Sequence, residues 1–284
     1  MRSRFAASLA ALALVLAGCS SSVATPTLTA ARSARAATAT AAATATALPV
    51  NLTIYGAASL KSALAKMETA YEAANPGTTL TISTDSSSAL ETKIEQGAPD
   101  DIFLSADTTN PQKLVDKGLA AGSPVKFAGN LLTVIVPTGN PAGIQTPADL
   151  AKTGVKVIAA GDTVPITKYA AQLVTNLAKQ PGYPADFAAK YAANVVSKQD
   201  NVAAVVAQID LGEGDAAIVY VTDAKTSSRV APIAVPAAAN VPATYSGVVV
   251  RASASANAAR AFMTWLVGPD GQAILASFGF LPAS

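Results

Sequence analysis

A strand-forming run passes directly into an amphipathic helix in Leu52-Thr-Ile-Tyr-Gly-Ala-Ala-Ser-Leu-Lys-Ser-Ala-Leu-Ala-Lys-Met67. The first four residues are typical of a β-strand. Apolar residues then recur at the spacing of one helix face, namely Leu60, Ala63, Leu64, Met67 and Tyr71. Ser59 stands immediately before that face, where a helix N-cap belongs. The stretch therefore predicts a strand whose carboxyl end meets the start of a helix.

The same alternation of strand and helix continues along the chain. Strands are predicted over 79–83, 102–105, 131–136, 155–159, 216–220, 230–235 and 245–250. Helices are predicted after Asp85-Ser-Ser-Ser88, from about Pro165, and over 111–117, 147–152, 201–211, 254–267 and 269–277. This order indicates an α/β fold with mostly parallel sheets that helices cover on both faces. In such sheets ligands bind at the carboxyl ends of strands, against helix N-termini.

The composition excludes several classes of site. Among the 284 residues there is no histidine, and Cys19 is the one cysteine. The chain therefore cannot build a Ser-His-Asp or Cys-His catalytic unit, an internal disulfide, a zinc ribbon or an iron–sulfur cage. Residues 1–49 hold four arginines and no acid, so residues 50–284 carry 16 basic and 18 acidic groups. A nearly neutral body has no general attraction for nucleic acid or for an anionic membrane.

The N-terminal segment has the features of a bacterial lipoprotein signal. An apolar run from Phe5 to Ala17 follows a basic start and is shorter than the roughly 20 residues that span a bilayer. Leu16-Ala-Gly-Cys19 resembles a lipobox, whose cysteine is acylated and becomes the new N-terminus; an ordinary signal peptide is the alternative. We expect a signal peptide over 1–18, a lipid anchor on Cys19, and an Ala/Thr-rich disordered linker over 19–49, with a surface helix as the alternative for the linker.

Hydroxyl side chains gather where predicted strands give way to helices. Ser59 follows the first strand, Ser86-Ser-Ser88 follows the second, and Tyr220 ends a later one. Backbone N–H groups at helix starts favour an anion, and no basic residue lies inside these segments. Neutral donors would therefore hold the anion, each hydrogen bond contributing about 1.5–3 kcal/mol. A purely structural N-cap is the alternative role for each serine.

Two short motifs leave an enzyme open as an alternative. Ser123-Pro-Val-Lys126 fits Ser-x-x-Lys, and Lys152-Thr-Gly154 fits Lys-Thr-Gly, as in serine β-lactamases and penicillin-binding proteins. The two motifs lie under thirty residues apart with no Ser-Asp-Asn between them. In that family the motifs are far apart in sequence, so the match is interpreted as coincidence.

An ordered set of short blocks along residues 50–284 resembles the periplasmic molybdate-binding proteins of ABC transporters. The blocks are Tyr55-Gly-Ala-Ala-Ser-Leu60, Ser86-Ser-Ser-Ala-Leu90, Glu95-Gln-Gly-Ala-Pro-Asp-Asp-Ile-Phe-Leu-Ser-Ala-Asp107, Gly161-Asp-Thr-Val-Pro165, Asp200-Asn-Val202, Ile218-Val-Tyr220 and Gly279-Phe280. The third block is the most specific of them. The resemblance implies a two-lobed periplasmic binding protein fold of type II, with each lobe a mostly parallel sheet flanked by helices. It places lobe one at 50–134 and 238–284 and lobe two at 135–237, joined by crossover strands near Val136 and Pro236.

The resemblance also implies which residues hold the ligand. Ser59 and Ser87 would each give a hydroxyl and a backbone N–H, Ile166 and Val202 a backbone N–H, and Tyr220 its phenolic hydroxyl. The metal would be bound as an oxyanion, with no direct metal ligand and no cofactor.

Two departures from the family pattern leave the choice among molybdate, tungstate and smaller oxyanions open. Ile166-Thr167 stands where the family often has Ala-Gly, and Ala203 stands where an arginine is common. A backbone donor does not depend on its side chain, but a β-branched isoleucine narrows the space beside it.

From these features we expect the substrate-binding lipoprotein of an ABC importer, located outside the cytoplasm. It would capture molybdate, and tungstate as well, between its lobes, deliver the anion to a membrane permease, and act as a monomer without catalysis. One alternative is a binding protein for sulfate, phosphate or an organic anion. The other is a secreted enzyme on a two-lobed α/β scaffold.

Overall fold

The computed structural model describes residues 49–283. The predicted signal peptide, Cys19 and the linker up to residue 48 lie outside the described residues and stay predictions. Among the residues described, none of the helices has the length and apolar character needed to cross a membrane.

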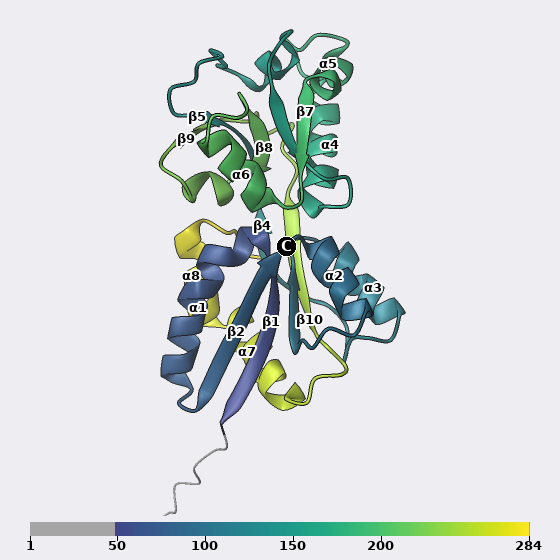
Figure 1. The fold of residues 1–284 in the computed structure, drawn as a ribbon, viewed down its shortest axis with the longest axis vertical. Helices are drawn as coiled ribbons and strands as arrows, with labels where there is room; N and C mark the ends of the chain where they lie inside the picture. Colours follow the sequence, from purple (N-terminus) through teal and green to yellow (C-terminus); the bar gives the residue numbers. More distant parts are fainter. Residues whose placement is uncertain (1–48, 284) are drawn as a thin grey trace, which may run out of the picture. The chain divides into compact units, whose positions relative to one another are not determined.

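The first sheet has five strands in the order β2-β1-β3-β10-β4. They are β1 (Val50–Ala57), β2 (Thr78–Asp85), β3 (Ile102–Ser105), β4 (Val125–Asn130) and β10 (Ala243–Val249). One face is covered by α1 (Lys61–Ala74), α7 (Ala256–Val267) and α8 (Pro269–Phe278), and the other by α2 (Ser87–Glu95) and α3 (Thr109–Asp116) (Figure 1). This sheet and its helices form lobe one.

Lobe two contains a three-stranded sheet, β8-β5-β9, and a parallel pair, β6-β7. The strands are β5 (Leu132–Pro137), β6 (Val157–Ala160), β7 (Val195–Gln199), β8 (Ala217–Tyr220) and β9 (Val230–Ile233). A bridge between Val157 and Ala216 joins the two sheets. The helices α4 (Pro165–Leu177) and α6 (Val202–Asp210) pack on these strands, and α5 (Phe187–Ala193) packs beside α4. Three short 3-10 helices complete the described chain: η1 (Ala58–Leu60), η2 (Pro147–Ala151) and η3 (Asp223–Lys225).

The chain passes from the first sheet to the second between β4 and β5, and returns between β9 and β10. Leu131 alone separates β4 from β5, so the predicted limit between residues 134 and 135 falls inside β5. The predicted limit between 237 and 238 falls in the segment that joins β9 to β10. The lobe ranges themselves stay a prediction.

The sheets contain more antiparallel pairing than the sequence suggested. The strands β2, β1 and β3 are parallel, as expected, but β10 is antiparallel to both β3 and β4, and β5 is antiparallel to β8 and β9. The reason lies in the connections: β10 enters its sheet from the other lobe and therefore runs against strands that end facing that lobe. A strand that returns in this way needs no crossover helix.

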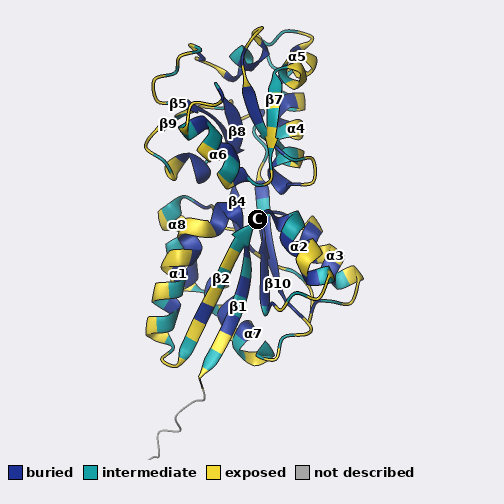
Figure 2. Cartoon of the chain, in the orientation of Figure 1, coloured by how far each residue is buried: buried dark blue, intermediate teal, exposed yellow. Residues whose placement is uncertain are grey.

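The core fixes the carboxyl end of β1. Leu52 and Ile54 on β1 are fully buried and pack in one cluster with Leu64 and Met67 of α1. Figure 2 shows buried residues along the strands and recurring along the helices of both lobes. Burying each such side chain stabilises the fold by about 1.5–3 kcal/mol. The residues that follow β1, including Ser59, are thereby held at the carboxyl end of this strand.

Candidate functional site

A small pocket between the two lobes is lined by all five residues that the sequence predicted as ligand donors. Its empty volume is about 210 Å³. The predicted donors in its lining are Ser59, Ser87, Ile166, Val202 and Tyr220, and the other lining residues are Ala57, Ala58, Ser86, Ala106, Val164 and Pro165. The lobe-one residues end β1 or follow β1, β2 and β3, whereas those of lobe two cap or begin α4, begin α6 or end β8. The pocket thus lies where carboxyl ends of strands meet helix N-termini, which is where α/β proteins bind ligands.

Ser59 does not cap a helix, contrary to the sequence prediction. It is the middle residue of η1, and α1 begins only at Lys61, after Leu60. Instead of accepting from its own helix, the Ser59 hydroxyl lies 2.9 Å from the phenolic oxygen of Tyr245. The short 3-10 turn interposed between strand and helix therefore turns Ser59 toward the pocket and toward β10.

The serines after β2 have separate roles. Ser86 is the N-cap of α2, and its hydroxyl oxygen accepts from the Ala89 N–H at 3.3 Å. Ser87 is fully buried at the first position of α2, and its hydroxyl oxygen accepts from the Ala106 N–H at 3.0 Å. Because that contact uses a lone pair and not the proton, the Ser87 hydroxyl keeps its proton for the pocket.

The lobe-two donors lie at helix starts. Pro165 is the first residue of α4 and Ile166 the second, so the Ile166 N–H lies among those that have no partner within the helix. Val202 is the first residue of α6, after the N-cap Asn201, whose side-chain oxygen accepts from the Ala204 N–H at 3.0 Å. Both sites present N–H groups at the positive end of a helix dipole, which favours an anion.

Tyr220 ends β8 and is 1% exposed. Within the described residues its hydroxyl is buried without a hydrogen-bond partner. Its pKa is well above the usual value, chiefly because of burial, so the phenol is neutral and carries its proton. Its ring packs edge-on against Tyr169 and Tyr245. A buried hydroxyl left unpaired costs about 1–3 kcal/mol, so an acceptor bound in the pocket would remove that penalty.

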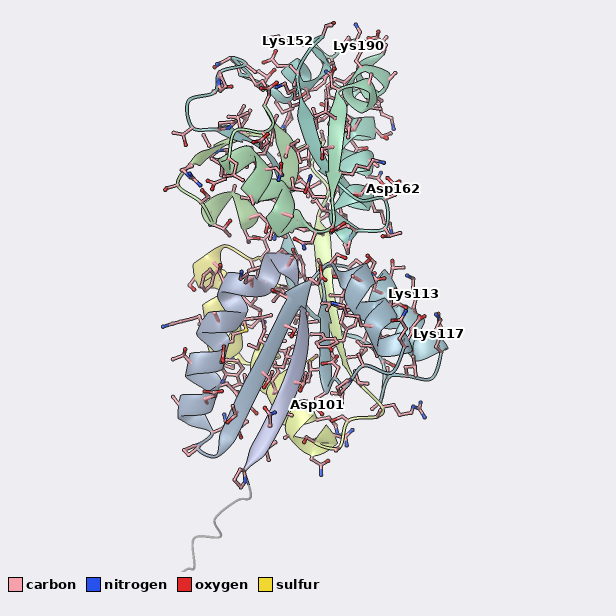
Figure 3. All side chains as sticks on the ribbon, viewed as in Figure 1. Asp101, Lys113, Lys117, Lys152, Asp162 and Lys190 are labelled. Carbon is pink, nitrogen blue, oxygen red and sulfur yellow. The ribbon has the colours of Figure 1, made fainter. Side chains whose placement is uncertain are left out.

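Within residues 49–283, the pocket lining contains no charged side chain. The nearest acid to Tyr220 along the chain is Asp223, whose carboxylate accepts from the Tyr220 N–H at 3.2 Å. Burial raises the pKa of Asp223 to about 7. Lys113 lies on α3 and Lys117 directly follows it, and they pair with Glu91 and Glu95 respectively, outside the pocket lining (Figure 3). The described part of the chain also has no cluster of three or more metal-binding side chains.

The motifs behind the enzyme alternative are not brought together. Ser123 precedes β4 in lobe one, whereas Lys152 follows η2 in lobe two and pairs with Asp149 at 2.9 Å. Neither residue lines the pocket.

Sequence reasoning missed Ala106 and Tyr245. Ala106 lines the pocket directly after β3, inside the most specific block, but an alanine carries no chemical signal of its own. Tyr245 contacts Ser59 from β10. The sequence of that strand predicts a buried strand and gives no sign that Tyr245 reaches Ser59.

The family model of the bacterial extracellular solute-binding proteins matches residues 52–281. The chain belongs to this family. The molybdate-binding protein ModA of Mycobacterium tuberculosis H37Rv is 31% identical over 231 residues, which cover 81% of this chain and 84% of that protein. The periplasmic molybdate-binding protein of Azotobacter vinelandii has a TM-score of 0.69 at 24% identity, with 82% of this chain and 100% of that chain covered. The sulfate-binding protein SubI of Mycobacterium tuberculosis H37Rv has a TM-score of 0.72 at 22% identity, with 82% of this chain and 87% of that chain covered.

The predicted relationship to periplasmic molybdate-binding proteins and the two-lobed α/β fold are thereby confirmed. The fold does not choose the anion, since a molybdate-binding and a sulfate-binding protein share it.

Proposed function

We propose that this solute-binding protein captures molybdate, and tungstate as well, in the pocket between its lobes. The observation that carries the proposal is the Tyr220 hydroxyl, which within residues 49–283 is buried without a partner in a lining that has no charged side chain. A doubly charged oxyanion offers only acceptors, and such a lining offers mainly donors. The molybdate-binding relative supports the choice of anion.

Five residues would hold the anion. Hydroxyl groups of Ser59, Ser87 and Tyr220 and backbone N–H groups of Ile166 and Val202 all border the same pocket. Hydrogen bonds to a charged group contribute about 1.5–3 kcal/mol each, and five to seven of them reach roughly micromolar affinity or better after the costs of association. Because the donors come from both lobes, the bound anion favours the closed arrangement of the lobes.

The same proposal covers the cellular role. Solute-binding proteins of this family are extracellular. We infer a lipid anchor on Cys19 after removal of residues 1–18, delivery of the anion to the permease of an ABC importer, and a monomeric protein. It would use no cofactor and catalyse no reaction, in keeping with its solute-binding relatives.

Titration calorimetry with molybdate, tungstate, sulfate and phosphate tests the choice of anion. We expect molybdate and tungstate to bind at least 100-fold more tightly than sulfate or phosphate, a difference of roughly 2.7 kcal/mol. Sulfate binding as tight as molybdate binding would overturn the assignment and favour the alternative of a different oxyanion. Hydrolytic turnover that Ser123→Ala abolishes would instead favour the enzyme alternative.

A further inference from the structure

Three buried side chains form a hydrogen-bonded chain that ends at the pocket. The side-chain nitrogen of Asn130 lies 3.4 Å from the phenolic oxygen of Tyr245, and that oxygen lies 2.9 Å from the Ser59 hydroxyl. Asn130 is 1% exposed, Tyr245 is 0% exposed and Ser59 is 9% exposed. Of the three, only Ser59 lines the pocket.

The orientation of the Asn130 amide is fixed by its other partners. Its oxygen accepts from the Leu131 N–H at 3.0 Å, and its nitrogen also donates to the Thr222 hydroxyl at 2.8 Å. A backbone N–H can only donate, so the amide oxygen must face it. The amide nitrogen therefore faces Tyr245 and donates to it.

The direction of the next hydrogen bond follows from the single proton of a phenol. The oxygen of Tyr245 accepts from Asn130, and among the described residues Ser59 is its other hydrogen-bond partner, so the buried phenol proton is paired when it is directed at Ser59. Burial raises the pKa of Tyr245 well above its usual value, so that proton is present. Ser59 thus accepts from Tyr245, and its own proton is left to point into the pocket.

We propose that Tyr245 and Asn130 are positioning residues, which act through Ser59 to make the pocket select oxyanions that carry no proton. The inference rests on the proposed function. Ser87 is held in the same sense, because its oxygen accepts from the Ala106 N–H, and the Tyr220 hydroxyl has its proton free. A protonated anion would bring an O–H into a pocket whose hydroxyl groups already point their protons inward, and it would lose affinity there.

A double-mutant cycle between Tyr245→Phe and Ser59→Ala tests this role. Calorimetry at neutral pH would measure the dissociation constants of molybdate and of inorganic phosphate, which keeps a proton at that pH. We expect Tyr245→Phe to weaken molybdate binding about 5- to 30-fold in the wild-type background and less than about 2-fold in the Ser59→Ala background. The preference for molybdate over phosphate should narrow in Tyr245→Phe, because Ser59 is then free to accept as well as donate.

Tyr71→Phe is the matched control, since Tyr71 is a buried tyrosine of lobe one that does not line the pocket. It should leave both dissociation constants unchanged. If Tyr245→Phe does not fold, Asn130→Ala replaces it in the cycle, with an expected effect of about 3- to 10-fold that Ser59→Ala again removes.

The outcomes separate this inference from the function on which it rests. An equal loss of affinity from Tyr245→Phe in both backgrounds, or an unchanged preference between the two anions, would show that Tyr245 only packs the core. If Ser59→Ala itself leaves molybdate binding unchanged, the assigned pocket is wrong, and the positioning role falls with it.

Discussion

The side-chain amide of Asn201 donates a hydrogen bond of 3.2 Å to the carboxylate of Asp85, and the two residues belong to different lobes. Asp85 ends β2 in lobe one, and Asn201 caps α6 in lobe two. A second contact between the lobes joins the hydroxyl groups of Ser88 and Thr163 at 3.4 Å. The neighbours of these residues, including Val202, line the pocket. We call the Asn201–Asp85 hydrogen bond the rim contact. Because its neighbours line the pocket, it is coupled to the positions of the proposed ligand donors.

Asp85→Ala should weaken oxyanion binding by about 1 kcal/mol, or roughly fivefold, by removing a contact that holds the lobes together. The loss should appear mainly in the rate of dissociation, since opening of the lobes releases the ligand. Stopped-flow measurement of release checks this. Asp162→Ala, which removes a surface partner of Lys198, is the control and should release the anion at the wild-type rate. A release rate unchanged in Asp85→Ala would mean that the rim contact does not oppose opening.

Tyr220→Phe should have opposite effects on binding and on the stability of the free protein. The variant loses a donor to the anion, which costs about 1–3 kcal/mol of binding. It also removes a buried hydroxyl that has no partner among the described residues, so the unliganded protein should become more stable by about 1 kcal/mol. Calorimetry and urea unfolding measure the two quantities. Unchanged affinity would refute the role of Tyr220, and a destabilised free protein would show that its hydroxyl is paired.

The two serines at the start of α2 should differ in their effect on affinity. Ser87→Ala should weaken binding by about 1–3 kcal/mol, because the proposed donor hydroxyl is lost, and it should also lower stability, because the buried Ala106 N–H loses its acceptor. Ser86→Ala should lower the free energy of unfolding by about 0.5–2 kcal/mol through loss of the helix cap and weaken binding less than Ser87→Ala does. The same two measurements on both variants decide the matter. A larger affinity loss for Ser86→Ala would exchange their roles.

Oxyanion affinity should fall as the pH rises through about 7. Burial raises the pKa of Asp223 to about 7, although the Tyr220 N–H that it accepts lowers it. Below that pH the carboxyl group is neutral, whereas above it a negative charge develops on Asp223, which contacts the proposed donor Tyr220 and would repel the anion. Binding should therefore be accompanied by proton uptake.

Calorimetry near pH 7 in buffers of different ionisation enthalpy measures that uptake. Asp223→Asn should abolish the uptake and flatten the affinity profile. The idea fails if the wild-type protein binds with no proton exchange in this range, or if Asp223→Asn keeps the wild-type profile.

The sequence predicted those elements whose pattern is local. β3 covers Ile102–Ser105, as predicted, because four consecutive buried residues leave a continuous signal. In contrast, β4 and β7 were not predicted, because neither shows a continuous apolar run. Lys126 and Gly129 interrupt β4, and Ser197 and Lys198 interrupt β7. Their pairing is decided by partners elsewhere in the chain.

The candidate site shows the same limit. The hydroxyl residues Ser59, Ser87 and Tyr220 were marked by their positions at strand ends, whereas Ile166 and Val202 were implied by the family resemblance. One pocket gathers all five. The contact between Ser59 and Tyr245 joins residues 186 positions apart, so no local pattern could reveal it.

Asp100 should make the protein less stable as the pH rises. It is 6% exposed, one carboxylate oxygen accepts from the N–H groups of Tyr55 and Ile102, and the other is buried without a partner among the described residues. Burial raises its pKa to about 8, against the lowering effect of those N–H groups, and the charge of Asp101 adds to the rise. An unfolded aspartate has a pKa of about 3.9. Between about pH 4 and pH 8 the Asp100 carboxyl group therefore keeps its proton in the folded protein and loses it in the unfolded chain. The stability of the folded protein falls as the pH rises across that window.

Asp100→Asn keeps the shape and the neutral state of that side chain at every pH. Its free energy of unfolding should exceed that of the wild-type protein by about 1–3 kcal/mol at pH ~9, and the difference should shrink toward pH ~5. Urea unfolding of the two proteins at each pH measures this difference in the free energy of unfolding. Asp116→Asn is the matched control: the exposed Asp116 carboxylate accepts from the Gln112 side chain at 2.8 Å, so its replacement should leave the pH dependence of stability as in the wild-type protein. Parallel pH profiles for the wild-type protein and Asp100→Asn would show that the buried carboxyl ionises without cost, which its unpartnered oxygen argues against.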